Sequence, residues 1–310
     1  MSKNNNDQKS KVESTFKSMD TEETLDIYFY RPIGYRFALI SKALNMTPNT
    51  ITVISIIIGV FAGHLFYYQD LTINVIGMLM LIFANSLDST DGQLARMTGQ
   101  TTKLGRFLDG FAGNVWYVSI YLHLWVRMMD SGYSPWILLL ILLTGLSHSF
   151  QAAMSDYYRN AHLFFIKKNS LDDIETSDEM KKDYDAISWK NNFFKKLYMR
   201  LFLNYNMEQE ILSSNFQKLI SFIAQKWGND VPDDIRAKFR EGSRPLQKYC
   251  NIMTVNTRMI ALFVSLFIGD PIWFILFEIS ILNIMLFYTV RKHERVSAAL
   301  YDEIKVHPAS

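Results

Sequence analysis

Long apolar segments are the feature that most constrains how this 310-residue chain can fold. A helix of about 20 residues crosses the hydrocarbon core of a bilayer, so an apolar run of that length has the size of a membrane span. Six such runs occur, at roughly 49–69, 73–96, 107–129, 135–163, 251–269 and 271–290. A large soluble protein can bury one or two of them. Six predict an all-α integral membrane protein with six transmembrane helices.

Basic residues are distributed unevenly between the segments that connect these runs. The connections at 69–72, 130–134 and 269–270 contain no Lys or Arg, whereas the segments at the other ends of the runs carry many. The positive-inside rule places the basic segments and both termini in the cytoplasm. We therefore expect a protein of the bacterial inner membrane, with its functional site facing the cytoplasm.

The polar segments divide the chain further. Residues 1–26 form a polar tail without the apolar core of a signal peptide, and 27–165 carry an interfacial helix and the first four spans. Residues 166–246 mix acidic and amphipathic stretches and predict a cytoplasmic helical insertion. Residues 247–292 hold the last two spans, and 293–310 form a cytoplasmic tail.

The segment before the first span has its own pattern. Tyr28 to Met46 is aromatic and basic, which is typical of a helix lying on the membrane surface. Thr47 is a favourable N-cap and Pro48 suits a first helical turn, so a new helix is predicted to begin there.

Three acidic residues cluster where the second span ends and the third begins. Asp88 and Asp91 are three residues apart and share a helix face, and Asp109 follows a short loop. Ion pairs with Arg96 or Arg106 would account for one or two of these acids. They would not account for the surrounding small residues, which let a ligand approach closely: Ser89, Gly92, Ala95, Gly105 and Gly110. Clustered carboxylates suit Mg²⁺ or Mn²⁺, which in turn bind phosphates, so the cluster predicts a metal–diphosphate site.

The spacing Asp88-x2-Asp91-Gly92-x2-Ala95-Arg96-x8-Gly105-x3-Asp109 resembles the signature of the CDP-alcohol phosphotransferase family. The resemblance covers roughly 30–165 and 247–292. It implies a six-helix membrane enzyme, usually a homodimer, that depends on Mg²⁺ or Mn²⁺. Such an enzyme transfers the phospho-alcohol group of a CDP-linked lipid, commonly CDP-diacylglycerol, to the hydroxyl of a small polar alcohol and releases CMP in phospholipid synthesis. We expect no nucleic-acid partner.

The resemblance also implies roles for individual residues. It implies metal ligation by three carboxylates: Asp88, Asp91 and Asp109. It implies nucleotide contacts and room for the diphosphate from Asn49, Thr52, Gly92, Ala95, Arg96 and Gly105.

The family signature continues with a fourth acid at position 113, but this chain has Gly113 followed by Asn114. In the family that acid is the candidate general base, and an amide is no useful base. In one reading position 113 is empty and Asn114 points elsewhere, since residues 109 and 114 lie about 140° apart on a regular helix. In the reading we favour, Gly110 and Gly113 loosen the turn and a local widening brings Asn114 to the place of the base. Either reading predicts substrate binding with poor turnover; the alternative is a catalytically impaired or non-catalytic binding relative.

Two arginines are candidates for binding the acceptor. Arg159 ends the fourth span, in a run Tyr157-x-Arg159-x-Ala161 that weakly resembles the acceptor side of phosphatidylinositol-phosphate synthases, and Arg258 lies in the fifth span. Such arginines equally often extend to lipid headgroups. Together they would suit an inositol phosphate or glycerol phosphate acceptor.

Overall fold

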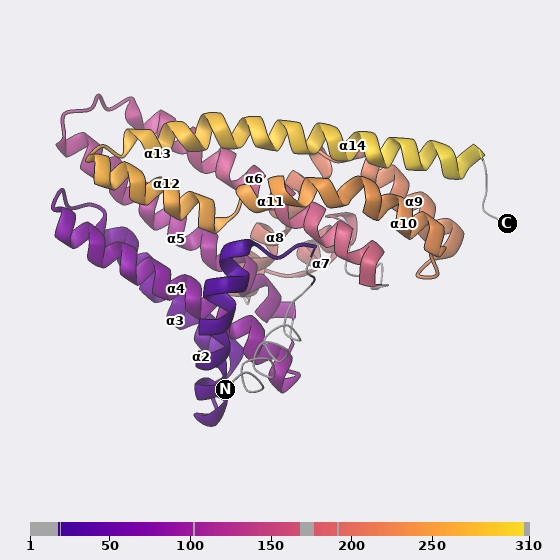
Figure 1. The fold of residues 1–310 in the computed structure, drawn as a ribbon, viewed down its shortest axis with the longest axis horizontal. Coiled ribbons are helices and arrows are strands. Elements are labelled where there is room, and N and C mark those ends of the chain that lie inside the picture. Colours follow the sequence, from indigo (N-terminus) through magenta and orange to yellow (C-terminus); the bar gives the residue numbers. More distant parts are fainter. Residues whose placement is uncertain (1–17, 19, 102, 168–176, 191, 307–310) are drawn as a thin grey trace. The chain divides into compact units, whose positions relative to one another are not determined.

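The computed structural model describes residues 18, 20–101, 103–167, 177–190 and 192–306. These residues are helical, with no strand among them, and the expected all-α class is confirmed for this part of the chain (Figure 1). They divide into two compact units, which are described separately. The first comprises Met1–Leu146 and Val255–Ile279, and the second comprises Ser147–Thr254 and Ser280–Ser310.

The first unit holds the N-terminal helices and most of the apolar runs. Its elements are η1 (Asp26–Tyr30), α2 (Arg31–Ala43), α3 (Pro48–Leu65), α4 (Leu71–Thr98), α5 (Lys103–Asp130), α12 (Val255–Ile268) and α13 (Ile272–Phe277). Helix α6 (Ile137–Lys167) begins in this unit and η4 (Glu278–Leu282) follows α13. The elements η1 and η4 are π-helical, and the expected helix at 28–46 is confirmed as η1 followed by α2.

The start of α3 follows from the residues that cap it. Thr47 is extended, and its hydroxyl accepts a hydrogen bond from the backbone nitrogen of Thr50 at 3.3 Å. Pro48 occupies the first turn, where its missing N–H costs nothing. The predicted helix start at Thr47-Pro48 is confirmed, and it fixes which residues of α3 face α4.

Helices α3 and α5 pack closely around one aromatic side chain. Trp116 is fully buried, and its indole nitrogen donates to the carbonyl of Ser55 at 3.1 Å. Gly59 lies under the ring, because a methyl group at that position would come within 2.2 Å of the ring atom Cδ1 of Trp116. Glycine therefore lets the two helix backbones approach, as small residues do between membrane helices.

The second unit consists of the end of α6 and the helices after it. They are α7 (Ser177–Ala186), α8 (Phe193–Ile211), α9 (Ser214–Trp227), α10 (Asp233–Ser243), η3 (Arg244–Leu246), α11 (Gln247–Ile252) and α14 (Asn283–Val306). Helices α6, α9, α10 and α14 share an aromatic core in which Tyr158 stacks on His293 with the ring centroids 3.7 Å apart. The predicted insertion at 166–246 is thus helical where it is described.

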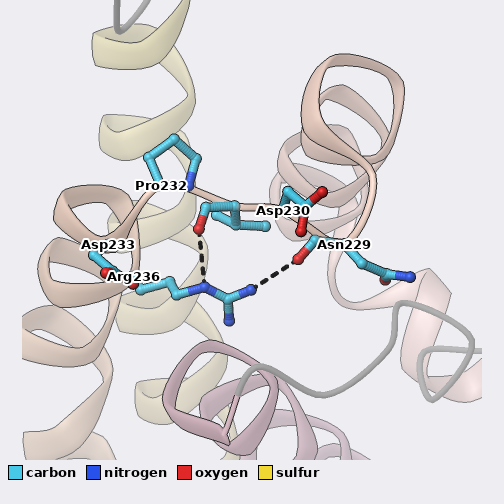
Figure 2. A pocket seen from close by; sticks show the side chains of 6 residues that line it. Asn229, Asp230, Pro232, Asp233 and Arg236 are labelled. Carbon is cyan, nitrogen blue, oxygen red and sulfur yellow. Dashed lines mark hydrogen bonds between the residues drawn. The ribbon is translucent and has the colours of Figure 1, made fainter.

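Arg236 organises the loop between α9 and α10. Its guanidinium donates to the carbonyls of Val231 and Asn229 at 3.0 and 3.1 Å (Figure 2). It also donates to the carbonyl of Phe164 at 2.9 Å. A hollow of about 400 Å³ lies beside it, lined by Asn229, Asp230, Val231, Pro232, Asp233 and Arg236. None of the predicted site residues lines this hollow.

Five helical stretches of the described chain are long and apolar enough to cross a membrane. They are Pro48–Leu65, Leu71–Thr98, Ile137–Ile166, Asp233–Ile268 and Ile272–Val306. An integral membrane protein is therefore supported. The sixth expected span, 107–129, falls on α5, which is helical but is not one of the five.

Candidate active site on helices α3 and α4

Helix α4 carries the first two acids of the predicted cluster. Asp88 is half-buried, Asp91 is 3% exposed, and their spacing of three residues places them on one face of the helix. The hydroxyl of Thr52 donates to Oδ2 of Asp91, and the same hydroxyl lies 3.1 Å from the carbonyl oxygen of Pro48. The first turn of α3 thus holds the second carboxylate of the cluster in place, and Thr52 lies where the resemblance implied.

Gly92 and Arg96 are also one turn apart on α4, and the arginine side chain folds back over the glycine. A methyl group added at Gly92 would lie 3.5 Å from Nη1 and 3.6 Å from Nη2 of Arg96. Because Gly92 has no side chain, the guanidinium of Arg96 can lie against the backbone of Gly92, the residue that follows Asp91. A planar cation there can bind phosphate oxygens by paired hydrogen bonds. Asn49, Ala95 and Gly105 are half-buried.

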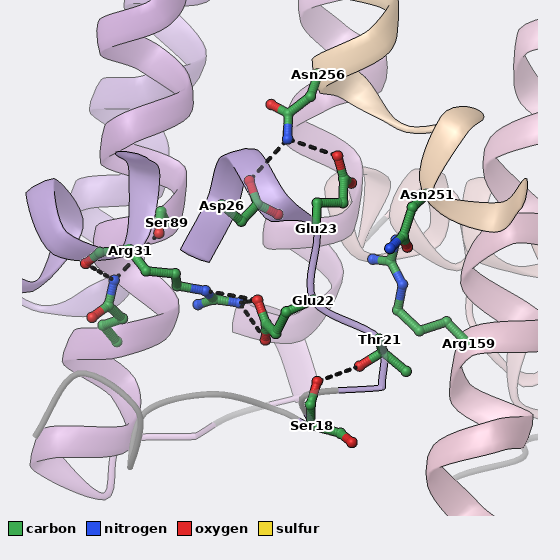
Figure 3. Close-up of polar contacts among 11 residues, drawn as sticks. Ser18, Thr21, Glu22, Glu23, Asp26, Arg31, Ser89, Arg159, Asn251 and Asn256 are labelled. Carbon is green, nitrogen blue, oxygen red and sulfur yellow. Dashed lines mark hydrogen bonds and ion pairs between the residues drawn. The ribbon is translucent and has the colours of Figure 1, made fainter. Parts of the chain in front are cut away.

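Helix α2 lies against α4. A methyl group at Gly34 would come within 2.7 Å of the amide nitrogen of Gln93. That amide donates to the carbonyl of Arg31 at 3.1 Å and to the hydroxyl of Ser89 at 3.3 Å (Figure 3). The N-terminal helix therefore supports α4 along the stretch that carries the acids.

An acidic segment before α2 joins the same unit, and the sequence interpretation missed it. Asn256, the second residue of α12, donates through its amide nitrogen to Glu23 at 2.8 Å and to Asp26 at 2.9 Å (Figure 3). Asn85 of α4 donates to the amide oxygen of Asn256 at 3.0 Å. Tyr30 also hydrogen-bonds Asn85; burial raises the pKa of Tyr30, and this bond opposes the rise.

The only sequence signal for this contact was the largely apolar, aromatic stretch that begins at Leu25, two residues after Glu23. Such a stretch indicates that a polar segment continues into a packed helix. It does not show which distant residue the acids meet, because the partner Asn256 lies 233 residues beyond Glu23.

Helix α5 is α-helical from Lys103 to Asp130. The widened turn expected at Gly110 or Gly113 is therefore wrong: the described backbone contains no π-helical turn there. The side chain of Asp109 lies outside the described residues.

A regular α5 fixes what Gly113 and Asn114 face. A methyl group at Gly113 would lie 3.3 Å from Cγ2 of Val255 on α12, so position 113 points toward that helix. Asn114 is half-buried and, on a regular helix, lies about 140° around the axis from Asp109. Its role in the place of the base stays a prediction without the widened turn that motivated it.

The two arginines expected at the acceptor have different surroundings. Arg258, in the first unit, is 1% exposed and forms an ion pair with the fully buried Glu278. Arg159, in the second unit, is half-buried, and its guanidinium donates to the side-chain oxygen of Asn251 at 3.2 Å. Arg159 therefore has the more accessible cation, and the roles of both at the acceptor stay predictions.

The donor set of α4 can be compared with what a divalent cation requires. Asp88 and Asp91 supply carboxylate oxygens, the ligands that Mg²⁺ and Mn²⁺ prefer. Among the described residues no group of three His, Cys, Asp or Glu side chains is placed to hold a metal ion. The two carboxylates fit such an ion in chemistry, and the third expected ligand is Asp109, whose side chain is not described.

The long apolar helices indicate an integral membrane protein, and helix α4 carries two acids on one face. Residues 45–164 match the model of the CDP-alcohol phosphatidyltransferase family. The resemblance drawn from the motif is confirmed: the chain carries a CDP-alcohol phosphatidyltransferase domain over this range. This family is generally dependent on divalent metal ions.

Two characterised relatives are similar over shorter stretches. The archaetidylinositol phosphate synthase of Pyrococcus horikoshii is 39% identical over 67 residues, 22% of this chain and 34% of that protein. The bifunctional IPC transferase and DIPP synthase of Aquifex aeolicus is 34% identical over 65 residues, 21% of this chain and 14% of that protein. The similarity thus spans about a third of the first relative and about a seventh of the second. No solved structure matches the chain.

Proposed function

We propose that this protein transfers the phospho-alcohol group, a phosphatidyl group, of a CDP-linked lipid such as CDP-diacylglycerol to the hydroxyl of a small polar alcohol, releasing CMP. The observation that carries the proposal is the geometry of α3 and α4 within the matched domain. Thr52 hydrogen-bonds Asp91. The side chain of Arg96, one turn further along α4, folds back over Gly92. The arrangement would provide carboxylates that bind a cation and a guanidinium that binds the diphosphate of the CDP-linked lipid.

The residues divide the work in this proposal. Asp88, Asp91 and Asp109 would hold Mg²⁺ or Mn²⁺, which when bound neutralises the diphosphate and improves CMP as a leaving group. Arg96 binds phosphate oxygens, and the absence of a side chain at Gly105 gives the diphosphate room. Asn49 and Thr52 lie on the nucleotide side.

An inositol phosphate is the acceptor that we propose. The first relative is named for inositol phosphate chemistry, and Arg159 offers a half-buried guanidinium for a phosphate group. Because a charged hydrogen bond contributes about 1.5–3 kcal/mol, Arg159→Ala should raise the KM for a phosphorylated acceptor more than tenfold. Binding of the CDP-lipid should not change.

The membrane arrangement belongs to the same proposal. Helix α5 would be the sixth span, since it is 28 residues long and contains the apolar run at 107–129. Elements η1 and α2 would lie at the membrane surface. The exposure of Tyr28 in η1 and of Leu44 at the C-cap of α2, 77% and 66%, supports this. The site would face the cytoplasm of a bacterial cell, and the protein would act as a homodimer.

A second candidate function is favoured by Gly113. Since this position has no carboxylate on α5, the chain would turn over slowly, or would be a non-catalytic relative that binds a CDP-lipid.

A thermal-shift experiment tests the binding site that both candidates share. CDP-diacylglycerol with Mn²⁺ should raise the melting temperature of the purified protein, because a ligand that binds only the folded state stabilises it. Asp91→Ala should abolish the rise, and Asp302→Ala, which removes an exposed acid of α14, should retain it. An equal rise for the parent and Asp91→Ala would contradict the placement of the site.

A further inference from the structure

Two carboxylates of the N-terminal segment are held together by a single amide. Glu23 and Asp26 both accept from the side-chain nitrogen of Asn256, at 2.8 and 2.9 Å (Figure 3). Asn256 is 6% exposed, so this amide is a fixed, buried support rather than a surface contact. A segment that looks like solvated tail in the sequence is therefore attached to the first unit through its acids.

The same amide ties the two acids to the helix that carries the metal-binding motif. The oxygen of Asn256 accepts from Asn85 at 3.0 Å, and Asn85 precedes Asp88 by three residues on α4. Residues three apart on a helix are neighbours on one face, about 5–6 Å apart at Cβ. Glu23 and Asp26 are thus linked through the amide of Asn256 to Asn85, which lies one helical turn before Asp88 on α4.

The support also adjoins the position where a base is absent. Asn256 follows Val255, and Val255 is the residue that a side chain at Gly113 would meet, at 3.3 Å. The three elements α4, α5 and α12 therefore converge near this amide. Helix α5 has no carboxylate at position 113, and two carboxylates of the N-terminal segment are held by Asn256, the residue that follows Val255.

We propose that Glu23 or Asp26 is the general base of the transfer reaction, replacing the carboxylate that α5 lacks at position 113. The inference rests on the proposed function. In the step, the carboxylate accepts the proton of the acceptor hydroxyl as the oxygen forms a bond to the phosphorus of the lipid phosphate. The bond from that phosphorus to the bridging oxygen of the diphosphate breaks, and CMP leaves with the electron pair.

Two features suit these acids to the role. An alcohol becomes an effective nucleophile only when a positioned base takes its proton, and a base contributes about 10²–10⁴-fold. Asn256 donates to both carboxylates without neutralising either, because an amide carries no charge. The pair is also held by a segment outside the spans, which can reach a polar acceptor that arrives from the aqueous side.

The test removes the two acids and then restores a carboxylate on α5. The variants are Glu23→Gln, Asp26→Asn and the double variant, with Asp302→Asn as a control that removes the charge of an exposed acid on α14. Each is tested for CMP release from CDP-diacylglycerol with Mn²⁺ and inositol phosphate, as a function of pH. The rise in melting temperature with CDP-diacylglycerol and Mn²⁺ is measured alongside.

The double variant should lose about 10²–10⁴-fold in turnover and lose the fall in rate at acidic pH that protonation of a carboxylate base produces. The double variant should keep the rise in melting temperature, and Asp302→Asn should keep the parent's turnover. Adding Gly113→Asp to the double variant should restore turnover. The rescue separates a missing base from a damaged fold, because a new carboxylate cannot repair misfolding.

Three results would overturn the proposal: turnover of the double variant at the parent's rate, loss of turnover that Gly113→Asp does not restore, or a parent that binds CDP-diacylglycerol without any turnover. Failure of the underlying function gives a different pattern, since the parent would then show neither a rise in melting temperature nor CMP release.

Discussion

The hydroxyl of Thr52 donates a hydrogen bond to Oδ2 of Asp91 and so joins the first turn of α3 to the motif helix α4. Both residues are almost fully buried, at 2% and 3% exposed. A carboxylate in such surroundings keeps its orientation only while its partner remains. The cap at Thr47, which fixes where α3 begins, therefore also determines the position of the acid.

Thr52→Val should weaken the binding of Mn²⁺ and CDP-diacylglycerol by about 10–100-fold, the usual effect of removing a group that orients a ligand to a metal. Valine has nearly the shape of threonine but no donor. Isothermal titration measures both affinities. Thr50→Val, an exposed change two residues earlier in the same helix, is the control, and an equal loss in the control would show that the helix cap rather than the bond to Asp91 is responsible.

Arg258 and Glu278 form a fully buried ion pair, so removing one partner leaves an uncompensated charge. Arg258→Met and Glu278→Leu should each destabilise the protein by about 3–5 kcal/mol, whereas the double variant should recover most of that loss. The melting temperatures of the parent, the two single variants and the double variant, measured in detergent, complete this double-mutant cycle. The double variant should also keep the parent's KM for the acceptor. A stable double variant with a raised KM would instead support Arg258 as an acceptor ligand.

Gly59→Ala should destabilise the protein by about 1–3 kcal/mol, because the new methyl group would overlap Trp116 in a closely packed core. Gly145→Ala is the matched change in α6, where no neighbour lies within 4 Å, and it should stabilise by up to about 1 kcal/mol. The free energies of unfolding of the two variants should thus move in opposite directions. A neutral Gly59→Ala would show that α3 and α5 are farther apart than the structure has them.

Burial raises the pKa of Glu208 on α8, and the hydrogen bonds from Ser149, at 2.9 and 2.8 Å, oppose this only in part. A carboxyl whose pKa is higher in the folded state favours folding while it is protonated, at acidic pH. That contribution is lost as the pH rises through the folded-state pKa, so the ionised group costs stability at neutral pH. Glu208→Gln should therefore melt above the parent at pH 7 and close to it at pH 4. A lower melting temperature at pH 7 would contradict the sign.

Much of the fold could be predicted from the sequence, because neighbouring residues determine it. Thr47 and Pro48 predict where α3 begins, and the apolar runs predict the long helices, since a helix start depends on adjacent residues and a span on length and composition. The spacing of Asp88 and Asp91 likewise predicts one acidic face. The family signature added the remaining positions of the motif.

The contacts that the sequence could not supply are those between distant segments. Nothing adjacent to Glu23 or Asp26 indicates that Asn256 holds them, and nothing near Arg258 identifies Glu278 as its partner. The widened turn at Gly113 was wrong because glycine content alone does not decide where a helix widens, and α5 stays α-helical through both glycines. The π-helical turns of the described chain lie instead at η1 and η4.

The most direct measurement is the joint yield of the two products. The purified protein in lipid nanodiscs is incubated with CDP-diacylglycerol, Mn²⁺ and inositol phosphate, and CMP and the phosphatidyl product are quantified together. Phosphatidyl transfer predicts the two in equal amounts, at a rate that Asp91→Ala abolishes. CMP without a lipid product, or neither product although CDP-diacylglycerol binds, would contradict it.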